Sequence, residues 1–286
     1  MEQKPKPNFE EISLDKKKIF DEFLSCYPPR ISELTFTNLF AWRKSKNYKF
    51  AVYDGHLLVS LKDEAGEAML QPIGPEPHNI IELFAETTRF VRVDKKIAEK
   101  LKGRLKITPD RDMFDYVYDV NALKTLAGDK YNAKRNLINR FEKQEPVVLV
   151  INQEIIQECL NLEKIWCDLK NCSQDLNLIS ESGAIRETLE NFTSLKVMGV
   201  AIKINDHIEG FAIGEQLNKE TFVEHFEKAN PKYTGIYQFL LMEFAKSIPQ
   251  GILYINREQD LGVEGLRKAK LSYHPVFFIE KVDVSY

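Results

Sequence analysis

The chain has 286 residues, of which 43% are hydrophobic and 29% are charged. This composition is sufficient for one large or two medium folded domains and excludes a mainly disordered chain. With 40 basic and 43 acidic side chains the net charge is -3. That balance excludes a protein that binds nucleic acid through its overall charge, so any basic site must be local.

Several functional classes are disfavoured by what the sequence lacks. No run approaches the roughly 18 consecutive apolar residues that span a bilayer, and Met1–Glu10 lacks the apolar segment of a secretory signal. The four cysteines form no CxxC pair and the five histidines are scattered singly. We therefore expect a cytoplasmic protein with reduced thiols, without a disulfide framework, a metal site or a transmembrane segment.

Hydrophobic periodicity in the first half predicts two helices, a meander of three antiparallel strands, a further helix and two short strands. In chain order these elements span 14–26, 33–44, 48–53, 57–61, 68–73, 80–84, 105–108 and 114–118. Tyr27, Arg30 and Trp42 are candidates for lining a substrate cleft, although Trp42 has the helical spacing from Leu39 that is typical of a core residue.

The second half has the same order of elements. They span 153–169, 182–192, 195–204, 208–216, 221–226, 235–247, 252–255, 261–269 and 273–280. The repetition predicts an internal structural duplication, although the two halves share no sequence identity that can be aligned. We expect an N-terminal domain over 1–127, a connecting helix over 128–145 and a C-terminal domain over 146–286.

The predicted connecting helix is amphipathic and basic. Five basic and two acidic side chains between Gly128 and Lys143 give this segment a local charge of +3, with an apolar stripe at helical spacing. It is either a solvated linker helix or a surface for RNA or another phosphate-bearing ligand. In the second case Lys134, Arg135 and Arg140 are the expected contacts.

Three strings carry a resemblance to a known family. They are NAKRNLINRF at 132–141, HFEKAN at 225–230 and NREQDLGVEGLRKAKLSYHP at 256–275. The strings, together with the order of elements, resemble a bacterial family related to the C-terminal catalytic domain of phosphatidylglycerol lysyltransferase. The resemblance implies an α/β (α+β) fold with tandem GNAT-like domains, each an open mixed sheet flanked by helices.

The resemblance also implies an activity. The better-known relatives transfer an aminoacyl group from tRNA to an amine or hydroxyl group of a lipid. They carry a large membrane-spanning portion that has no counterpart in this sequence, so a lipid acceptor is less favoured here. The acetyl-CoA branch of the fold has a pyrophosphate loop of the type Arg/Gln-x-x-Gly-x-Gly/Ala, whereas the corresponding segment here, 230–237, keeps a single glycine.

A donor site is predicted at the loop that leads into the helix near Gly235, because the N-terminus of a helix favours an anion. A second group follows the strand 252–255, at an edge where open α/β sheets bind ligands. Basic side chains on the next helix extend this group. The predicted donor-binding or phosphate-binding residues are Lys228, Asn230, Lys232, Tyr233, Gly235, Tyr237, Asn256, Arg257, Glu258, Arg267 and Lys270. The simpler interpretation is that these residues form turns, helix caps and surface ion pairs.

Three residues are candidates for catalysis. Alternation along the strand puts His225 and Glu227 on one face, where an imidazole and a carboxylate together deprotonate an attacking amine. The alternative is a hydrogen-bonded structural pair. Tyr273 occupies the place at which many GNAT enzymes keep a tyrosine as general acid, and its alternative role is packing on the sheet.

These features predict a transferase of the GNAT superfamily that moves an aminoacyl group from charged tRNA to a small-molecule, lipid or peptide acceptor. The degraded glycine loop and the flanking basic helices favour aminoacyl-tRNA as the donor. The alternatives are an N-acyltransferase that uses acyl-CoA, and a non-catalytic binding protein built on a duplicated GNAT scaffold.

Overall fold

The computed structural model describes residues 6–63 and 65–286. These residues form two compact units. Unit 1 comprises the chain up to Asp115, together with Gln259–Gly262 and Ile279–Tyr286. Unit 2 comprises Tyr116–Glu258 and Val263–Phe278.

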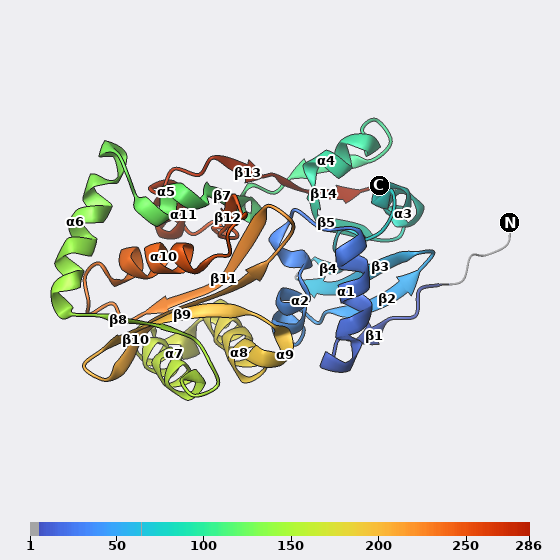
Figure 1. The fold of residues 1–286 in the computed structure, drawn as a ribbon. Coiled ribbons are helices and arrows are strands. Elements are labelled where there is room, and N and C mark those ends of the chain that lie inside the picture. Colours follow the sequence, from blue (N-terminus) through green and yellow to red (C-terminus); the bar gives the residue numbers. More distant parts are fainter. Residues whose placement is uncertain (1–5, 64) are drawn as a thin grey trace, which may run out of the picture. The chain divides into compact units, whose positions relative to one another are not determined.

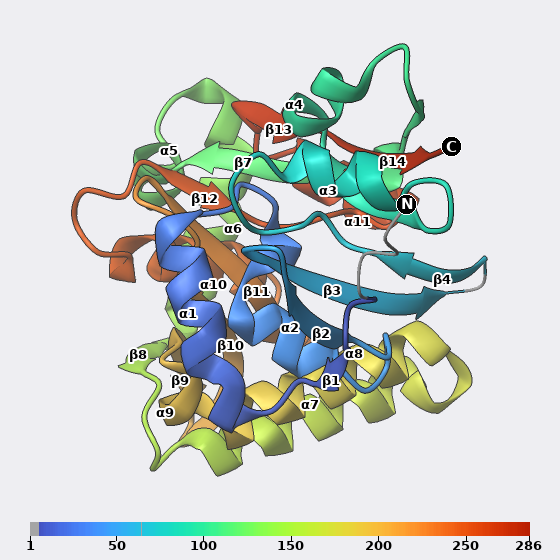
Figure 2. The same cartoon turned by 90° about the vertical axis from the view of Figure 1, so that its right-hand side faces the viewer.

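Unit 1 is an open mixed sheet with helices on both faces. Its strands are β1 (Glu10–Glu11), β2 (Lys49–Tyr53), β3 (His56–Asp63), β4 (Gly66–Met69), β5 (Arg89–Asp94), β6 (Lys106–Pro109) and β14 (Lys281–Ser285). Its helices are α1 (Lys17–Cys26), α2 (Phe36–Trp42), α3 (Pro77–Phe84) and α4 (Lys95–Ala98). The order across the sheet is β1-β2-β3-β4-β5-β14-β6, and among the described residues β4 and β5 are parallel whereas the other neighbours are antiparallel. Figure 2 shows β2, β3 and β4 side by side.

The two faces of this sheet have separate apolar cores because successive side chains of a strand point to opposite faces. On one face, the ring of Phe20 in α1 lies 4.9 Å from that of Phe50 in β2 and 5.1 Å from that of Phe36 in α2. On the other face, α3 and α4 pack against buried strand residues that include Leu58 and Val93. Both faces are therefore covered by helices.

Unit 2 has the same architecture. Its strands are β7 (Asp115–Asp119), β8 (Val147–Val150), β9 (Met198–Ile204), β10 (His207–Gln216), β11 (Thr221–Ala229), β12 (Tyr254–Asn256) and β13 (Phe277–Ile279). Its helices are α5 (Val120–Thr125), α6 (Asn132–Phe141), α7 (Ile156–Lys170), α8 (Leu176–Glu190), α9 (Phe192–Leu195), α10 (Ile236–Ser247) and α11 (Glu264–Leu271). The strand order is β13-β7-β12-β11-β10-β9-β8. Figure 1 shows α7 and α8 on one face of β9–β11 and α10 on the other.

The two sheets share one strand order, and each is completed by a strand from the other half of the chain. In unit 1, β14 lies between β5 and β6, and in unit 2, β7 lies between β12 and β13. The predicted tandem arrangement of open mixed sheets flanked by helices is thus confirmed. The compact units do not follow the predicted divisions 1–127, 128–145 and 146–286, because this exchange moves the last strand of each half into the other sheet.

Most predicted elements are present, and the differences have local causes. The short strands β1 and β8, which open each half, were not predicted because runs of two and four residues give little periodic signal. The predicted strand 273–280 is instead the turn at His274, whose φ is +57°, followed by β13 and then β14. The predicted basic helix is α6.

The expectation of reduced thiols without a disulfide is wrong for one pair. Cys167 near the end of α7 and Cys172 form a disulfide with a Cα–Cα distance of 5.0 Å. The helix ends at Lys170, and the left-handed φ of +52° at the next residue, Asn171, turns the chain back and brings the two cysteines together. In the described part of the chain, no helix has both the length and the apolar character that crossing a bilayer requires.

Candidate active site

The candidate site lies in unit 2, where the parallel pairing of two strands ends. β11 and β12 are paired from Thr221↔Tyr254 to Val223↔Asn256, after which β11 continues to Ala229 and the chain leaves β12. Glu224, His225 and Glu227 follow on β11, and Arg257 and Glu258 follow β12. The carboxyl ends of parallel strands in open α/β sheets are where ligands bind, so these side chains are well placed for chemistry.

Arg257 is the centre of the cluster. Its Nη2 lies 2.5 Å from Oε2 of Glu227, and its Nε donates to Glu224. The side chain of Arg257 is only 10% exposed, and that of Glu224 is 4% exposed. A buried guanidinium between two carboxylates is costly to desolvate but holds both acids in fixed positions.

A β-bulge decides which side chains of β11 face Arg257. Ile213 pairs with Phe226 and the next residue, Gly214, pairs with Glu224, so His225 is the extra residue of the bulge. The extra residue shifts the alternation by one position. The prediction that His225 and Glu227 share a face is therefore wrong, and Glu224 joins Glu227 at Arg257 instead.

His225 is held between two other carboxylates. Its Nδ1 lies 2.8 Å from Oε1 of Glu258, its Nε2 lies 2.9 Å from Oε1 of Glu215, and its side chain is 1% exposed. Burial disfavours the charged imidazole, but the hydrogen bonds to both carboxylates outweigh this and raise the pKa of His225 to about 9. At neutral pH the ring is protonated, so it has no lone pair with which to accept a proton from an amine.

Two carboxylate oxygens in the cluster lack a hydrogen-bond partner among the described residues. They are Oε1 of Glu224 and Oε1 of Glu227, and both are buried. Burial raises the pKa of Glu227 to about 8, with Arg257 opposing the rise and Glu224 adding to it. Buried polar atoms without a partner are rare in folded proteins, so the two oxygens mark this cluster as a candidate for a functional role.

Lys270 and two tyrosines complete the cluster. The Lys270 ammonium donates to the carbonyl oxygen of Arg257, and burial, with Arg257 nearby, lowers the pKa of Lys270 to about 8. The Tyr118 hydroxyl donates to the Lys270 carbonyl oxygen at 2.8 Å. The Tyr273 ring lies 5.5 Å from the Arg257 guanidinium, and burial raises the pKa of Tyr273. Tyr273 therefore keeps its proton, as a general acid must.

In the loop predicted to bind phosphate, Lys228 and Asn230 bind glutamate side chains of the protein itself. Lys228 lies within β11 and is buried, where it pairs with Glu181 at 2.8 Å and its Nζ lies 3.5 Å from the centre of the Trp166 ring. Asn230 donates to Glu209 at 2.8 Å and accepts from the backbone N–H of Lys232. The charge of Lys228 is thus already neutralised within the protein.

The N-terminus of α10 is closely packed. Gly235 has a φ of +98°, and a Cβ at this position would lie 2.3 Å from the carbonyl oxygen of Leu137 in α6. Tyr237, the second residue of α10, donates to the Ala229 carbonyl oxygen at 3.0 Å and accepts from Trp166 at 3.1 Å. The contact between Gly235 and α6 leaves less room for a diphosphate than an open helix N-terminus provides.

Of the other residues predicted to bind donor or phosphate, some form hydrogen bonds within the protein and others are exposed. Asn256 is fully buried and its side-chain oxygen accepts from the backbone N–H of Glu258. Arg135 donates to the carbonyl oxygens of Leu126 and Gly128. Several other predicted residues are partly or fully exposed, namely Lys232, Tyr233, Arg140 and Arg267.

Lys134 is the residue of α6 that reaches the cluster. Its Nζ lies 4.1 Å from the centre of the Tyr273 ring and donates to Ser272 at 2.6 Å. The prediction that Arg267 and Lys270 form a basic surface patch is wrong, because Lys270 is only 8% exposed and its ammonium donates to the Arg257 carbonyl oxygen.

Within the described residues, no group of three or more His, Cys, Asp or Glu side chains is arranged to hold a metal ion.

Sequence reasoning missed Glu224 and Tyr118. Strict alternation along the strand assigns Glu224 to the face opposite His225, because the bulge is not visible in the sequence. Tyr118 belongs to β7, which reaches this sheet only through the strand exchange. The catalytic roles of His225, Glu227 and Tyr273 stay predictions. The pKa values, about 8 for Glu227 and about 9 for His225, favour Glu227 as the group that exchanges a proton near neutral pH.

Comparison with known proteins places the chain among related sequences and folds. The family model described as phosphatidylglycerol lysyltransferase, C-terminal, matches residues 25–282. A conserved protein of unknown function from Bacteroides thetaiotaomicron is 35% identical, with a TM-score of 0.90 over 98% of this chain and 99% of that chain. The L-PGS structure from Bacillus licheniformis has the same fold, with a TM-score of 0.66 at 15% identity over 98% of this chain and 94% of that chain.

A curated relative is similar over part of its length. The protein MYCGA3080 of Mycoplasmoides gallisepticum is 29% identical over 174 residues, which cover 58% of this chain. The match spans only 54% of the length of that relative.

Proposed function

The chain belongs to the family of the phosphatidylglycerol lysyltransferase C-terminal domain, and on this premise we propose that it transfers an aminoacyl group from charged tRNA to an amine or hydroxyl acceptor. The observation that carries the proposal is the buried cluster of Arg257 with Glu224 and Glu227. Its two carboxylate oxygens without partners suit an amino group, which an aminoacyl donor has and a simple acyl donor lacks.

The chemistry follows from the protonation states in the cluster. The acceptor nitrogen or oxygen attacks the ester carbonyl carbon, and Glu227, with a pKa of about 8, takes the proton that the acceptor loses. The bond between the carbonyl carbon and the ribose oxygen then breaks, and Tyr273 supplies the proton to that oxygen. The proton passes from Glu227 back to Tyr273 through solvent, which restores both groups.

Glu224 and Arg257 orient the reactants. Glu224 accepts from the amino group of the aminoacyl moiety through its Oε1, while Arg257 holds both carboxylates in place. Fixing the donor in this way converts a reaction between two free molecules into one between positioned groups.

Two features support aminoacyl-tRNA over acyl-CoA as the donor. The loop from Asn230 to Tyr237 has one glycine, so few of its backbone N–H groups can approach a diphosphate closely. In addition, α6 packs against Gly235 at the start of α10. The basic residues Lys134 and Arg140 of α6 remain the proposed contacts with the tRNA backbone. The acceptor is a small-molecule, lipid or peptide amine or hydroxyl group.

The donor is tested by comparing ligands in one binding assay. Purified protein is mixed with aminoacylated tRNA, with the same tRNA after deacylation, and with acetyl-CoA. We expect the aminoacylated pool to bind more tightly than the deacylated one and its ester to hydrolyse more slowly in the complex. Stabilisation against heat by acetyl-CoA alone would instead favour the acyl-CoA alternative. Equal binding of both tRNA pools without any protection of the ester would favour a binding protein.

A further inference from the structure

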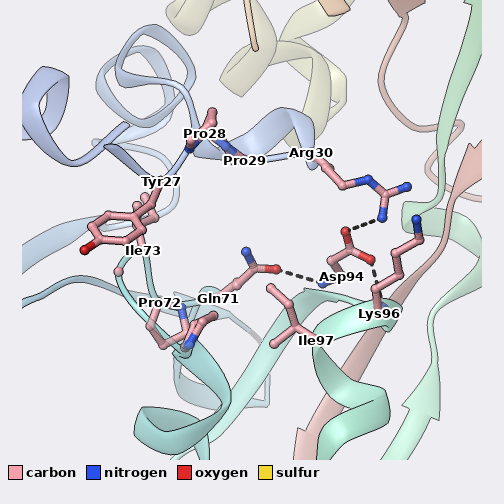
Figure 3. Close-up of a pocket in the computed structure, with 12 residues that line it drawn as sticks. Tyr27, Pro28, Pro29, Arg30, Gln71, Pro72, Ile73, Asp94, Lys96 and Ile97 are labelled. Atoms are coloured by element: carbon pink, nitrogen blue, oxygen red, sulfur yellow. Dashed lines mark hydrogen bonds and ion pairs between the residues drawn. The ribbon is translucent and has the colours of Figure 1, made fainter. Parts of the chain in front are cut away.

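A second site lies in unit 1, where the parallel strands β4 and β5 separate. They pair only at Ala68↔Arg89 and Met69↔Phe90, after which β5 continues to Asp94 and the chain turns away from β4. A cavity of about 250 Å³ lies at this point and is drawn in Figure 3. It is somewhat smaller than most small-molecule sites, so it suits a compact ligand.

The walls of the cavity are largely apolar and come from separate segments. Tyr27 and Pro28 belong to the turn after α1, Pro72 and Ile73 follow β4, and Ile97 belongs to α4. The Tyr27 side chain borders the cavity in Figure 3, and the residue is 40% exposed. These surfaces suit a short aliphatic or aromatic group.

The charged side of the cavity carries more positive than negative charge. Arg30 donates to Oδ2 of Asp94 at 2.8 Å, and Oδ1 of Asp94 accepts from the backbone N–H of Lys96 at 2.9 Å. Gln71 accepts from the backbone N–H of Asp94, which fixes the main chain at this residue. Figure 3 shows the Lys96 ammonium and the Arg30 guanidinium pointing to the same region. The carboxylate of Asp94 balances only one of the two cations.

We propose that this cavity binds a compact organic acid. Its carboxylate or phosphate group lies against Arg30 and Lys96, and its apolar body lies against Tyr27, Pro72 and Ile97. Arg30 retains donors that Asp94 does not use, and a guanidinium matches the geometry of both acid types. The pairing with Asp94 holds Arg30 in place for this contact.

The chemistry of the cavity differs from that of a diphosphate loop. The segment after β4 contains Pro72, Pro75 and Pro77, which have no backbone N–H, so its main chain cannot surround a diphosphate with donors. The positive charge comes instead from the side chains of Arg30 and Lys96. A single acidic group is therefore the expected anion.

The experiment measures the binding of four probe compounds to the full chain by isothermal titration calorimetry. Hexanoate and hexyl phosphate carry an acidic group on an apolar body, hexylamine reverses the charge, and inorganic phosphate lacks the body. We expect hexanoate or hexyl phosphate to bind, and hexylamine and inorganic phosphate to bind at least about tenfold more weakly. The stronger of the two acids identifies the acidic group as carboxylate or phosphate.

Variants locate the binding. Lys96→Gln and Arg30→Gln should each lower the affinity for the acidic probe by about tenfold, because each removes one charge-assisted hydrogen bond. Lys102→Gln, at a lysine of unit 1 that is 70% exposed and outside the cavity, should change nothing. Because Arg30 also pairs with Asp94, Lys96→Gln is the variant that tests binding without removing an ion pair of the protein.

The proposal is overturned if neither acid binds at millimolar concentration, if hexylamine or inorganic phosphate binds as tightly as the acids, or if Lys96→Gln has no effect. It does not depend on the proposed transferase activity, because none of its residues belongs to the Arg257 cluster. Loss of transfer in a Glu227 variant with intact acid binding, or the reverse, distinguishes the failure of one proposal from that of the other.

Discussion

At the scale of single residues, one extra residue in a strand decides the composition of the candidate site. The bulge at His225 turns Glu224 toward Arg257 and sends the imidazole to Glu215 and Glu258. Two acids then share one guanidinium, and an imidazolium lies between two other acids. The pKa values near 8 and 9 in this region follow from burial combined with these pairings.

The charge of His225 predicts how stability depends on pH. The pKa of this group is raised in the folded protein from 6.5 to about 9, so its stabilising effect is complete below pH 6.5 and is lost as the pH rises through 9. The rise corresponds to roughly 3 kcal/mol. We expect His225→Gln to lower the free energy of unfolding at pH 6 by about this amount and much less at pH 10.

Urea unfolding of both proteins between pH 6 and pH 10 measures this difference. Subtracting the two curves removes the contributions of groups that both proteins share, such as Glu227 and Lys270. A difference that stays constant across this range would mean that His225 is not charged in the folded protein.

A buried ion cluster in unit 1 provides a second prediction at this scale. The Lys281 ammonium lies 2.6 Å from Glu33 and 2.6 Å from Asp115, and the Lys281 side chain is completely buried. Lys281→Met removes the cation that two buried carboxylates share and leaves Glu33 only the longer ion pair with Arg92 at 3.9 Å, which costs about 3–5 kcal/mol. Thermal unfolding should show a large drop in Tm, whereas Lys95→Met, which removes an exposed pair with Glu280, should change Tm very little. Similar Tm values for the two variants would contradict the account.

At the scale of elements, the close contact between α6 and α10 depends on Gly235. Two glycines of unit 2 have nearly the same left-handed φ, +98° at Gly235 and +96° at Gly251, but only Gly235 has a neighbouring atom where a Cβ would lie. Gly251→Ala should therefore cost only the backbone strain, about 1–2 kcal/mol. Gly235→Ala adds the collision with Leu137, a further 1–3 kcal/mol.

Chemical unfolding of the two alanine variants checks this prediction. The same free energy of unfolding in both would mean that α6 does not pack against the start of α10. In that case the N-terminus of α10 would be open to an anion, and the acyl-CoA alternative would gain support.

Elements with strong periodicity were predictable from sequence, and long-range pairings were not. The amphipathic helix α6 and the meander β9–β11 follow from the spacing of apolar residues and from turn residues. The bulge at His225 depends on the partner strand, and the position of Tyr118 depends on which sheet β7 joins. Arg257 was predictable as a site residue because it directly follows a strand, whereas its two carboxylate partners required the three-dimensional structure.

At the scale of the whole molecule, the strand exchange makes each unit depend on both halves of the sequence. β14 is hydrogen-bonded to β5 and β6, and β7 is hydrogen-bonded to β12. A sheet that loses an interior strand exposes two unpaired edges and part of its core. The two units should therefore unfold together rather than one after the other.

Separate expression of the halves tests this dependence. We expect fragments 1–127 and 146–286 each to be insoluble or to lack dispersed amide NMR signals. Fragment 146–286 lacks β7, which carries Tyr118, and fragment 1–127 lacks β14 with Lys281. A well-dispersed spectrum from either fragment alone would contradict the role assigned to the exchanged strands.

The most direct test of the central claim is transfer of a labelled amino acid from an aminoacyl-tRNA pool to a panel of amine and hydroxyl acceptors. The account predicts transfer that increases with pH up to about 8, where Glu227 loses its proton, and then levels off. Glu227→Gln should reduce the rate by about a hundredfold or more and remove this pH dependence. The control is Glu264→Gln, at a glutamate of unit 2 that is 80% exposed, and it should retain the full rate. Transfer that is equally fast in Glu227→Gln and in the unmodified protein would contradict the account.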